Sequence, residues 1–302
     1  MPHPRSTTLP YRGRFAPSPT GPLHQGSLIA ALASYLDARH HRGAWLLRME
    51  DLDPPREESG AAQRILDSLQ NHGLLWDEEV LWQGQRHAAY AQALEQLWAN
   101  NHLFYCDCTR QKLGPEGACC GDCRRRQGSI ATPAATRVNV PPSTHIQFTD
   151  RVQGEQSTGL GQALPDFVVK RKDGLDAYQL AVVVDDAWQG VTHVLRGSDL
   201  LGSTARQVFL QQALGHPTPA YCHIPVITDT AGQKLSKQNH APALDDSHAP
   251  ANLRAALDFL CQDTPPAMPN TTDDILAFAI ERWAPQKIPA VMSIASTSGA
   301  GS

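Results

Sequence analysis

The sequence predicts an α/β protein whose parallel sheet is interrupted by an insertion and then resumed. The first observation is that residues 11–49 read as strand, Pro/Gly loop, helix and strand, the order of a parallel β-α-β unit. The second is that apolar, strand-like runs return at DFVVKR, AYQLAVVVDD and VTHVLRG, beyond a stretch rich in turn-forming residues. A parallel sheet with an insertion between its two halves is the simplest topology that accounts for both.

The individual elements follow from local patterns. YRGRFAP suits a short strand, and the helix after it carries Leu28, Leu32, Tyr35 and Leu36 at helical spacing until Gly43 stops it. AWLLRMED is a short apolar run bounded by charges, as expected of a buried strand. The remaining expected elements are helices around residues 62–73, 88–102 and 204–214, a strand at CHIPVIT, and amphipathic helices at ANLRAALDFLCQ and DDILAFAIERW.

Composition limits the class of protein. The 302 residues are 41% apolar and 19% charged, with no apolar stretch near twenty residues, which excludes a membrane-spanning or disordered chain. The N-terminus lacks the apolar core of a secretory signal, so we expect a cytoplasmic protein. The net charge of -4 argues against indiscriminate nucleic-acid binding. Two basic triplets, at residues 124–126 and 170–172, suit either an RNA backbone or solubility.

Five of the seven cysteines fall within residues 106–123. In a large cytoplasmic chain such a cluster indicates metal ligands before disulfides, with free buried thiols as the alternative. Cys106 and Cys108 can bind one metal ion, and Cys119 and Cys123 can supply the other two ligands of a tetrahedral zinc. A site made only of thiols, with no open position, predicts a structural ion that holds the insertion in shape.

The stretch RFAPSPTGPLHQGSL suggests a phosphate-binding loop between a strand and a helix. Gly26 leaves backbone N–H groups open to close approach by a ligand, and would let a flat adenine rest on the backbone. His24 and Ser27, the expected helix N-cap, can add hydrogen bonds to the same anion. Far along the chain, KLSK places Lys234 and Lys237 where two ammonium groups could converge on a triphosphate. An ordinary turn and a solvated charged loop are the alternatives.

With both stretches in the expected order, the sequence resembles the glutamyl branch of the class I aminoacyl-tRNA synthetases from Arg14 to about Pro250. RMEDLD, AYQLAVVVDD and VLRGSDL match further segments of that branch. The resemblance implies a Rossmann-like parallel sheet, with a zinc-bearing insertion and a small helical C-terminal portion. It also implies ATP as a substrate, accompanied by Mg²⁺. Two departures stand out: His-Gln-Gly-Ser replaces His-Ile-Gly-His, and Gln238 replaces a final serine.

The resemblance also suggests site residues for glutamate. Amino-acid activation joins a carboxylate to the α-phosphate of ATP, so it needs aligned anions and cations and no general base. His24 and Lys237 are the expected catalytic residues, with Lys234 ranked second. The resemblance places six residues in the amino-acid site: Arg14, Ala16, Ser18, Glu50, Tyr178 and Arg196. Glu50 suits the substrate ammonium, and the two arginines suit carboxylates through bidentate pairing; surface ion pairs and a core tyrosine are the alternatives.

The region after the lysine loop is short, about sixty residues, whereas discriminating members of the branch carry a large anticodon-binding region there. Together with the cysteine pattern, this resembles a short subfamily that attaches glutamate to queuosine in the anticodon loop of tRNA(Asp). The resemblance also favours Cys119 over Cys120 as the fourth metal ligand. The alternatives are a compact synthetase charging the 3′ end of tRNA(Glu), and a non-enzymatic zinc-containing RNA-binding relic.

We expect a monomer without membrane partners, organised in five segments. These are 10–105, the first half of the nucleotide-binding domain; 106–165, the zinc-bearing, β-rich insertion; 166–245, the second half; 246–290, a helical region; and 291–302, a disordered tail.

Overall fold

Parallel strands form the centre of the molecule. The computed structural model describes residues 10–229, 242–266 and 271–295. Strands β1 (Arg12–Phe15), β2 (Ala44–Met49) and β3 (Leu81–Trp82) pair in parallel in that order, and β9 (His193–Gly197) pairs in parallel with β10 (Ala220–Ile224). The N–H of Thr192, just before β9, donates to the carbonyl of Arg12 at 2.9 Å, so β9 runs beside β1. The expected strand-helix-strand unit is confirmed, with α1 (Gln25–His40) between β1 and β2.

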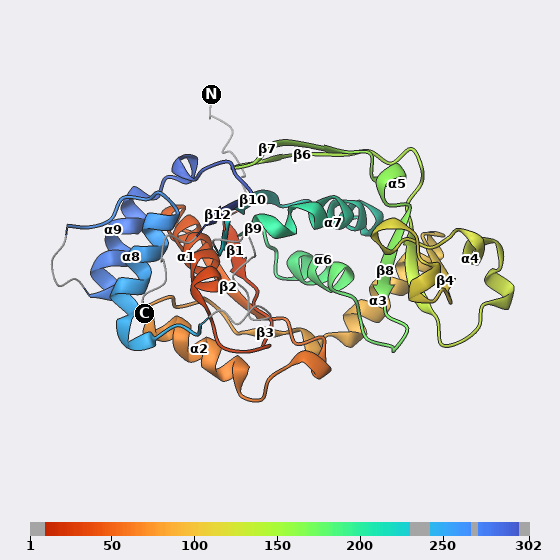
Figure 1. Cartoon of the computed structure of the whole chain (residues 1–302), viewed down its shortest axis with the longest axis horizontal. Helices are drawn as coiled ribbons and strands as arrows, with labels where there is room; N and C mark the ends of the chain where they lie inside the picture. The colour runs from red at the N-terminus through yellow and green to blue at the C-terminus, as the bar shows by residue number, and fades with distance from the viewer. Residues whose placement is uncertain (1–9, 230–241, 267–270, 296–302) are drawn as a thin grey trace, which may run out of the picture.

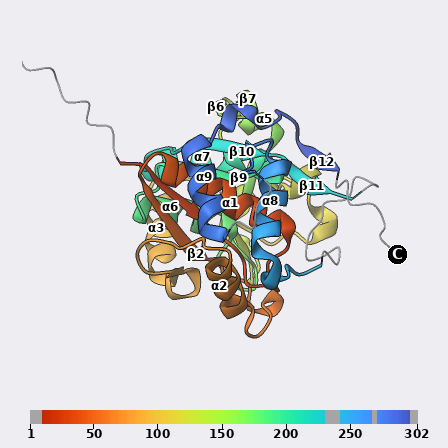
Figure 2. The same cartoon turned by 90° about the vertical axis from the view of Figure 1, so that its left-hand side faces the viewer.

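Helices cover both faces of these strands (Figures 1 and 2). One face packs on α1, α2 (Ala61–Asn71), α8 (Ala249–Phe259) and α9 (Thr272–Arg282), and the other on α3 (His87–Ala99), α6 (Tyr178–Trp188) and α7 (Leu201–Leu214). Strand β2 shows the alternation directly, because Trp45, Leu47 and Met49 join the α1 side while Leu46 joins the α6 side. Arg48 alternates with them and therefore faces α6, where it is fully buried.

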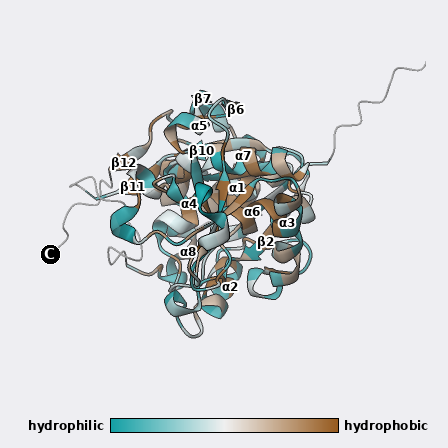
Figure 3. Cartoon of the chain, turned by 90° about the vertical axis from the view of Figure 1, so that its right-hand side faces the viewer, coloured by the Kyte–Doolittle hydropathy of each residue, from teal (hydrophilic) through white to brown (hydrophobic). Residues whose placement is uncertain are grey.

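The segment AYQLAVVVDD is helical, so the expectation of a strand there was wrong. It forms α6, in which every residue from Leu180 to Asp186 is buried. A helix enclosed on all sides loses its polar face, and with it the 3.6-residue period by which a helix is recognised in sequence. Figure 3 shows α6 and α1 in brown, as apolar helices inside the molecule. Tertiary packing thus made this segment a helix, although its β-branched residues favour a strand.

The insertion contains a separate antiparallel sheet. Strand β4 (Leu103–Cys106) pairs with β5 (Ala135–Asn139), which pairs with β8 (Asp166–Lys170). The run DFVVKR is therefore a strand, as expected, but it belongs to this antiparallel sheet and not to the central parallel strands. The short helix α4 (Asp122–Arg125) lies at this end of the molecule, opposite α8 and α9 (Figure 1).

A long hairpin and two further strands complete the fold. The hairpin of β6 (Ile146–Asp150) and β7 (Gly154–Thr158), followed by α5 (Leu160–Ala163), runs along one side of the molecule (Figure 1). Its base joins the central strands, since Asp150 pairs with Tyr221 of β10. Strand β11 (Val226–Thr228) pairs in parallel with β12 (Ser293–Ala295).

The two amphipathic helices expected near the C-terminus are present as α8 and α9, and both pack on α1. The residue after α9 fixes this docking, because Trp283 Nε1 donates to Asp37 Oδ1 of α1 at 2.8 Å. Arg151, at the base of the hairpin, donates to the same oxygen at 2.9 Å. Among the described residues, no helix is both long enough and apolar enough to cross a membrane.

Candidate active site

A pocket of about 970 Å³ opens where several parallel strands end. Ala16, Glu50, Gly197 and Pro225, at the carboxyl ends of β1, β2, β9 and β10, line it. This edge is the usual ligand-binding position in open α/β sheets. The structure brings nine of the expected site residues together around this one space: Arg14, Ala16, Ser18, His24, Gly26, Ser27, Glu50, Tyr178 and Arg196.

The His24 loop forms the entry to helix α1. The N-cap is His24 and not Ser27: its Nδ1 accepts from the N–H of Ser27 at 3.3 Å, and its Nε2 lies 3.1 Å from Ser27 Oγ. The imidazole of His24 reaches the third N–H of the helix. It therefore caps the helix, the role that we expected of the serine hydroxyl. A Cβ on Gly26 would lie 3.1 Å from His24 Cε1 and 3.2 Å from Ile227 Cγ2. The glycine is therefore needed for close packing of the helix start on the pocket wall.

The chain returns to this loop after residue 241. Ala243 forms a β-bridge with His24, and the N–H of Leu244 donates to the carbonyl of Leu23 at 2.9 Å. On the other side, Ile227 of β11 lines the pocket. One flank of segment 230–241 thus lines the pocket and the other pairs with the His24 loop, whereas Lys234 and Lys237 themselves fall outside the described residues.

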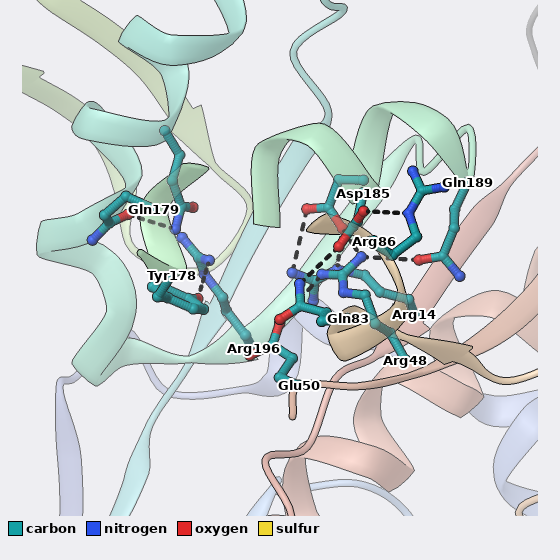
Figure 4. Close-up of polar contacts among 12 residues, drawn as sticks. Arg14, Arg48, Glu50, Gln83, Arg86, Tyr178, Gln179, Asp185, Gln189 and Arg196 are labelled. Atoms are coloured by element: carbon teal, nitrogen blue, oxygen red, sulfur yellow. Dashed lines mark hydrogen bonds and ion pairs between the residues drawn. The ribbon is translucent and has the colours of Figure 1, made fainter. Parts of the chain in front are cut away.

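A row of four buried, alternating charges adjoins the pocket, and two of its members, Arg14 and Glu50, line the pocket (Figure 4). Asp186 of α6 accepts from Arg14 Nε at 3.0 Å and from Arg48 Nη1 at 2.7 Å. Arg48 Nη2 in turn lies 3.4 Å from Glu50 Oε1. The four side chains carry two positive and two negative charges, so the row is neutral as a whole. This balance allows charged groups to remain inside the protein.

The pKa values of the two carboxyls are shifted in opposite directions. Burial raises the pKa of the Glu50 carboxyl above its ordinary value, although Arg48 and Arg14 partly offset it. For Asp186 burial also acts to raise the pKa, but Arg14 and Arg48 outweigh it and hold the pKa below its ordinary value. Asp186 is thus satisfied by the protein. Glu50, with one long contact to Arg48, can still gain from a ligand ammonium.

Arg196 forms the opposite part of the site, beside Tyr178 (Figure 4). Its Nε donates to His223 Nε2 at 3.0 Å and its Nη2 to Thr204 Oγ1 at 2.9 Å, while Nη1 lies 3.4 Å from Tyr178 Oη. The Nε and Nη2 edge of this guanidinium is therefore occupied by the protein. The same edge of Arg14 is occupied by Asp186. Any bidentate pairing with a ligand is limited to the terminal Nη1 and Nη2 atoms.

Several polar residues of this site were not anticipated from the sequence. Arg14 and Arg196 are 4% and 5% exposed, so they are not the surface ion pairs weighed as an alternative. Arg14 donates to Asp186, which also accepts from Arg48, and Arg196 donates to His223. Asp186, Arg48 and His223 are each a polar residue inside an otherwise apolar run: VVVDD, LLRM and CHI. A charge within a buried run is the available signal, because it has to find a partner in the fold.

The four expected thiols meet in the insertion. The Sγ atoms of Cys106, Cys108, Cys119 and Cys123 all lie within 4.8 Å of one another, with Cys108 3.9 Å from Cys119 and 3.5 Å from Cys123. Sulfurs around a tetrahedral zinc are about 3.8 Å apart for a Zn–S bond of about 2.3 Å, so this cluster can hold a metal ion. Cys120 is exposed, although its Sγ lies 3.6 Å from that of Cys108.

Ion pairs partly neutralise the two basic triplets. Arg124 contacts Asp166, Arg125 contacts Asp122, and Arg126 contacts Asp107. In the second triplet, Lys170 lies near Asp176, and Arg171 contacts Asp53 and Asp173. These pairs reduce the positive field that either triplet offers to an RNA backbone.

The comparison with known proteins decides the family. The profile described as "tRNA synthetases class I (E and Q), catalytic domain" matches residues 11–119 and 121–254. The chain belongs to the class I tRNA synthetases of this E and Q group. Membership makes it a ligase-type enzyme and confirms the expected fold class.

Relatives within this synthetase family match almost the whole chain. The chain is 50% identical over 284 residues to a "Glutamyl-Q tRNA(Asp) synthetase" of Pseudomonas putida (strain GB-1), covering 93% of this chain and 96% of that protein. It is also 50% identical to the protein of that name from Thiobacillus denitrificans, covering 92% and 94%. Among solved structures, a glutamate-tRNA synthetase from Elizabethkingia anophelis superposes with a TM-score of 0.80 at 25% identity, covering 96% of this chain and 68% of that one.

Proposed function

We propose that this enzyme activates L-glutamate with ATP as glutamyl-adenylate and transfers the glutamate to the queuosine base in the anticodon loop of tRNA(Asp). The observation that carries the proposal is the 50% identity to proteins named for that activity, over more than nine-tenths of both chains. The glutamate-tRNA synthetase structure shares the fold at half that identity. The relatives therefore favour this substrate over the 3′ end of tRNA(Glu).

Activation requires two anions to be aligned. An oxygen of the glutamate α-carboxylate attacks the α-phosphorus of ATP, a new P–O bond forms, and pyrophosphate leaves. The nucleophile is already an anion, so no general base is required. In the second step a hydroxyl of the modified nucleoside attacks the adenylate carbonyl and AMP leaves. Mg²⁺ bound to ATP would neutralise charge on the phosphates.

We assign the phosphates to the start of α1. His24, Gly26 and Ser27 line the pocket there, where the helix N-terminus favours anions. Lys237, with Lys234 as the second candidate, is proposed to supply the cation. This assignment is supported by the two flanks of its segment, since Ile227 lines the pocket and Ala243 pairs with His24, which also lines it.

We assign glutamate to the part of the pocket that Arg14, Glu50 and Arg196 line. Glu50 is proposed to accept from the substrate ammonium, and the terminal nitrogens of Arg14 and Arg196 to bind its carboxylates. Tyr178 lies beside Arg196, and Ala16 and Ser18 line the same space. The non-enzymatic alternative is disfavoured, because binding RNA alone would not require a neutral row of buried charges at the pocket.

We propose that the four thiols bind a structural Zn²⁺. The separations of their sulfur atoms fit tetrahedral coordination, and the cluster lies in the insertion. Elemental mass spectrometry on protein purified without added zinc should find close to one equivalent. Less than about a tenth of an equivalent in folded protein would refute a structural ion.

The test of the overall function is transfer of labelled glutamate to purified tRNA(Asp), with and without queuosine. Removing the 3′-terminal adenosine from both tRNAs eliminates the 3′ end as an alternative acceptor of glutamate. We expect label on the trimmed, queuosine-containing tRNA and none on the unmodified one. Label that disappears with the 3′ adenosine would identify a compact synthetase and refute the proposal.

A second test addresses the glutamate pocket. Arg196→Ala should lower glutamate-dependent pyrophosphate exchange about 100-fold, the effect of losing charged hydrogen bonds, while ATP binding persists. Unchanged exchange at low glutamate concentration would remove Arg196 from the pocket.

A further inference from the structure

Arg196 is the first of three buried side chains, from three different elements, that are linked by hydrogen bonds. Arg196 belongs to β9, His223 to β10 and Asp150 to the end of β6, at the base of the hairpin. Their exposed fractions are 5%, 0% and 2%. The distances are 3.0 Å from Arg196 Nε to His223 Nε2 and 2.6 Å from His223 Nδ1 to Asp150 Oδ2.

Hydrogen-bond chemistry fixes the direction of every bond in this chain. A guanidinium N–H can only donate, so His223 Nε2 has to accept and carries no proton. The ring proton then resides on Nδ1 and is donated to the Asp150 carboxylate. The neutral ring agrees with the pKa of His223, which burial lowers and which the neighbouring Arg196 lowers further, against the opposing effect of Asp150.

Asp150 is itself held in one orientation. Its Oδ1 accepts from three backbone N–H groups, those of Val152 at 3.0 Å, Gln153 at 2.9 Å and His223 at 3.1 Å. Burial alone would raise the pKa of this carboxyl, but the bonds from His223 and the backbone outweigh it and lower the pKa to about 2. Only Oδ2 is therefore directed at the imidazole.

We propose that Asp150 and His223 are positioning residues for the carboxylate-binding guanidinium of Arg196. Asp150 selects the Nδ1–H tautomer of His223, and the bare Nε2 of that tautomer holds Arg196 Nε. With Thr204 holding Nη2, the guanidinium keeps Nη1 beside Tyr178 in the pocket. This inference rests on the proposed function, because it assumes that Arg196 binds glutamate. It also makes the base of the β6–β7 hairpin a part of the glutamate site.

The sharpest perturbation is Asp150→Asn. The three backbone donors require an acceptor at the Oδ1 position, so the amide oxygen occupies it and the NH2 group faces His223 Nδ1. The ring then has to move its proton to Nε2, where it confronts the N–H of Arg196. A substitution that preserves size thus reverses the tautomer and releases the guanidinium.

Two substitutions at the histidine complete the design. His223→Leu removes the acceptor, whereas His223→Gln can place its amide oxygen near the former Nε2 and restore it. His72→Gln is the matched control, because His72 is equally buried and hydrogen-bonds Ser68 O at 2.7 Å, outside the pocket lining. Pyrophosphate exchange is measured over a range of glutamate and of ATP concentrations, with tRNA(Asp) present.

We expect Asp150→Asn and His223→Leu to raise the KM for glutamate about tenfold or more, with the KM for ATP changed less than about twofold. His223→Gln should recover most of the loss, and His72→Gln should leave both constants unchanged. An unchanged glutamate KM in folded His223→Leu would overturn the proposal. So would equal changes in both constants, which would indicate a merely structural role.

A spectroscopic readout tests the tautomer without any activity. In ¹⁵N-histidine spectra of the wild type, the His223 signals, identified by their loss in His223→Gln, should show the proton on Nδ1. A proton on Nε2 would overturn the proposal, even if the other variants fail to fold. Absence of glutamate-dependent exchange in the wild type would instead refute the proposed function, and the nitrogen spectrum would still decide the tautomer.

Discussion

Replacing Asp186 with asparagine tests whether the buried row of charges is held together by this one carboxylate. The substitution keeps the size of the side chain but removes its charge, so Arg14 and Arg48 are left with Glu50 as the only negative charge in the row. The row then changes from neutral to a net charge of +1. The amide NH2 of the new asparagine would also face a guanidinium N–H, which cannot accept a hydrogen bond.

The contacts set the size of the effect. Asp186 is 6% exposed and accepts from two arginines, at 2.7 Å from Arg48 and 3.0 Å from Arg14. Removing one partner of a buried ion pair costs about 3–5 kcal/mol, because the other partner remains buried without compensation. We expect a loss of this size in the free energy of unfolding. An exposed pair provides the control: Asp263→Asn, which removes the partner of Lys287, should cost less than about 1 kcal/mol.

Urea unfolding followed by tryptophan fluorescence measures both variants. The pH dependence gives a second check, since the folded pKa of Asp186 lies below its ordinary value of 3.8. A carboxyl with a lowered pKa stabilises the fold above its ordinary pKa, and this contribution is lost as the pH falls through the lower folded value. Asp186→Asn should therefore lose less stability on acidification than the wild type. A destabilisation below about 1 kcal/mol at neutral pH would refute the reasoning.

The remaining predictions concern the pocket and the thiol cluster. Gly26→Ala should weaken ATP binding several-fold in equilibrium titration, because the added Cβ would lie about 3.1 Å from His24 and displace the helix start; unaltered affinity would show that the loop adjusts freely. Glu50→Gln should raise the KM for glutamate. In the wild type that KM should rise as the pH falls toward the raised pKa of Glu50, since only the carboxylate attracts an ammonium, and a flat profile would exclude this role. Cys123→Ser should lose bound metal, whereas Cys120→Ser should retain it. The reverse result would show that Cys120, and not Cys123, is a metal ligand.

Local chemistry in the sequence, together with the family resemblance, indicated much of the site. The glycine and histidine of the first loop and the cysteine spacing require particular residue types, which are visible without a fold, whereas the resemblance selected the two arginines. The nine residues predicted to bind glutamate or ATP that the structure describes line one pocket, and the four thiols lie together. The roles given to them remain predictions.

Tertiary structure decided what depends on neighbours distant in the chain. The run AYQLAVVVDD forms α6, which the sequence did not reveal because a helix buried on all sides has no polar face and no visible 3.6-residue period. His24 is the cap in place of Ser27, because α1 begins at Gln25 and the imidazole accepts from the N–H of Ser27. The partners of Arg14 and Arg196 were also undetermined, since Asp186 and His223 lie 172 and 27 residues away from them. The sequence by itself determined which groups can do chemistry. Only the fold determined which groups face one another, because burial requires each charge to be paired and topology selects the partner.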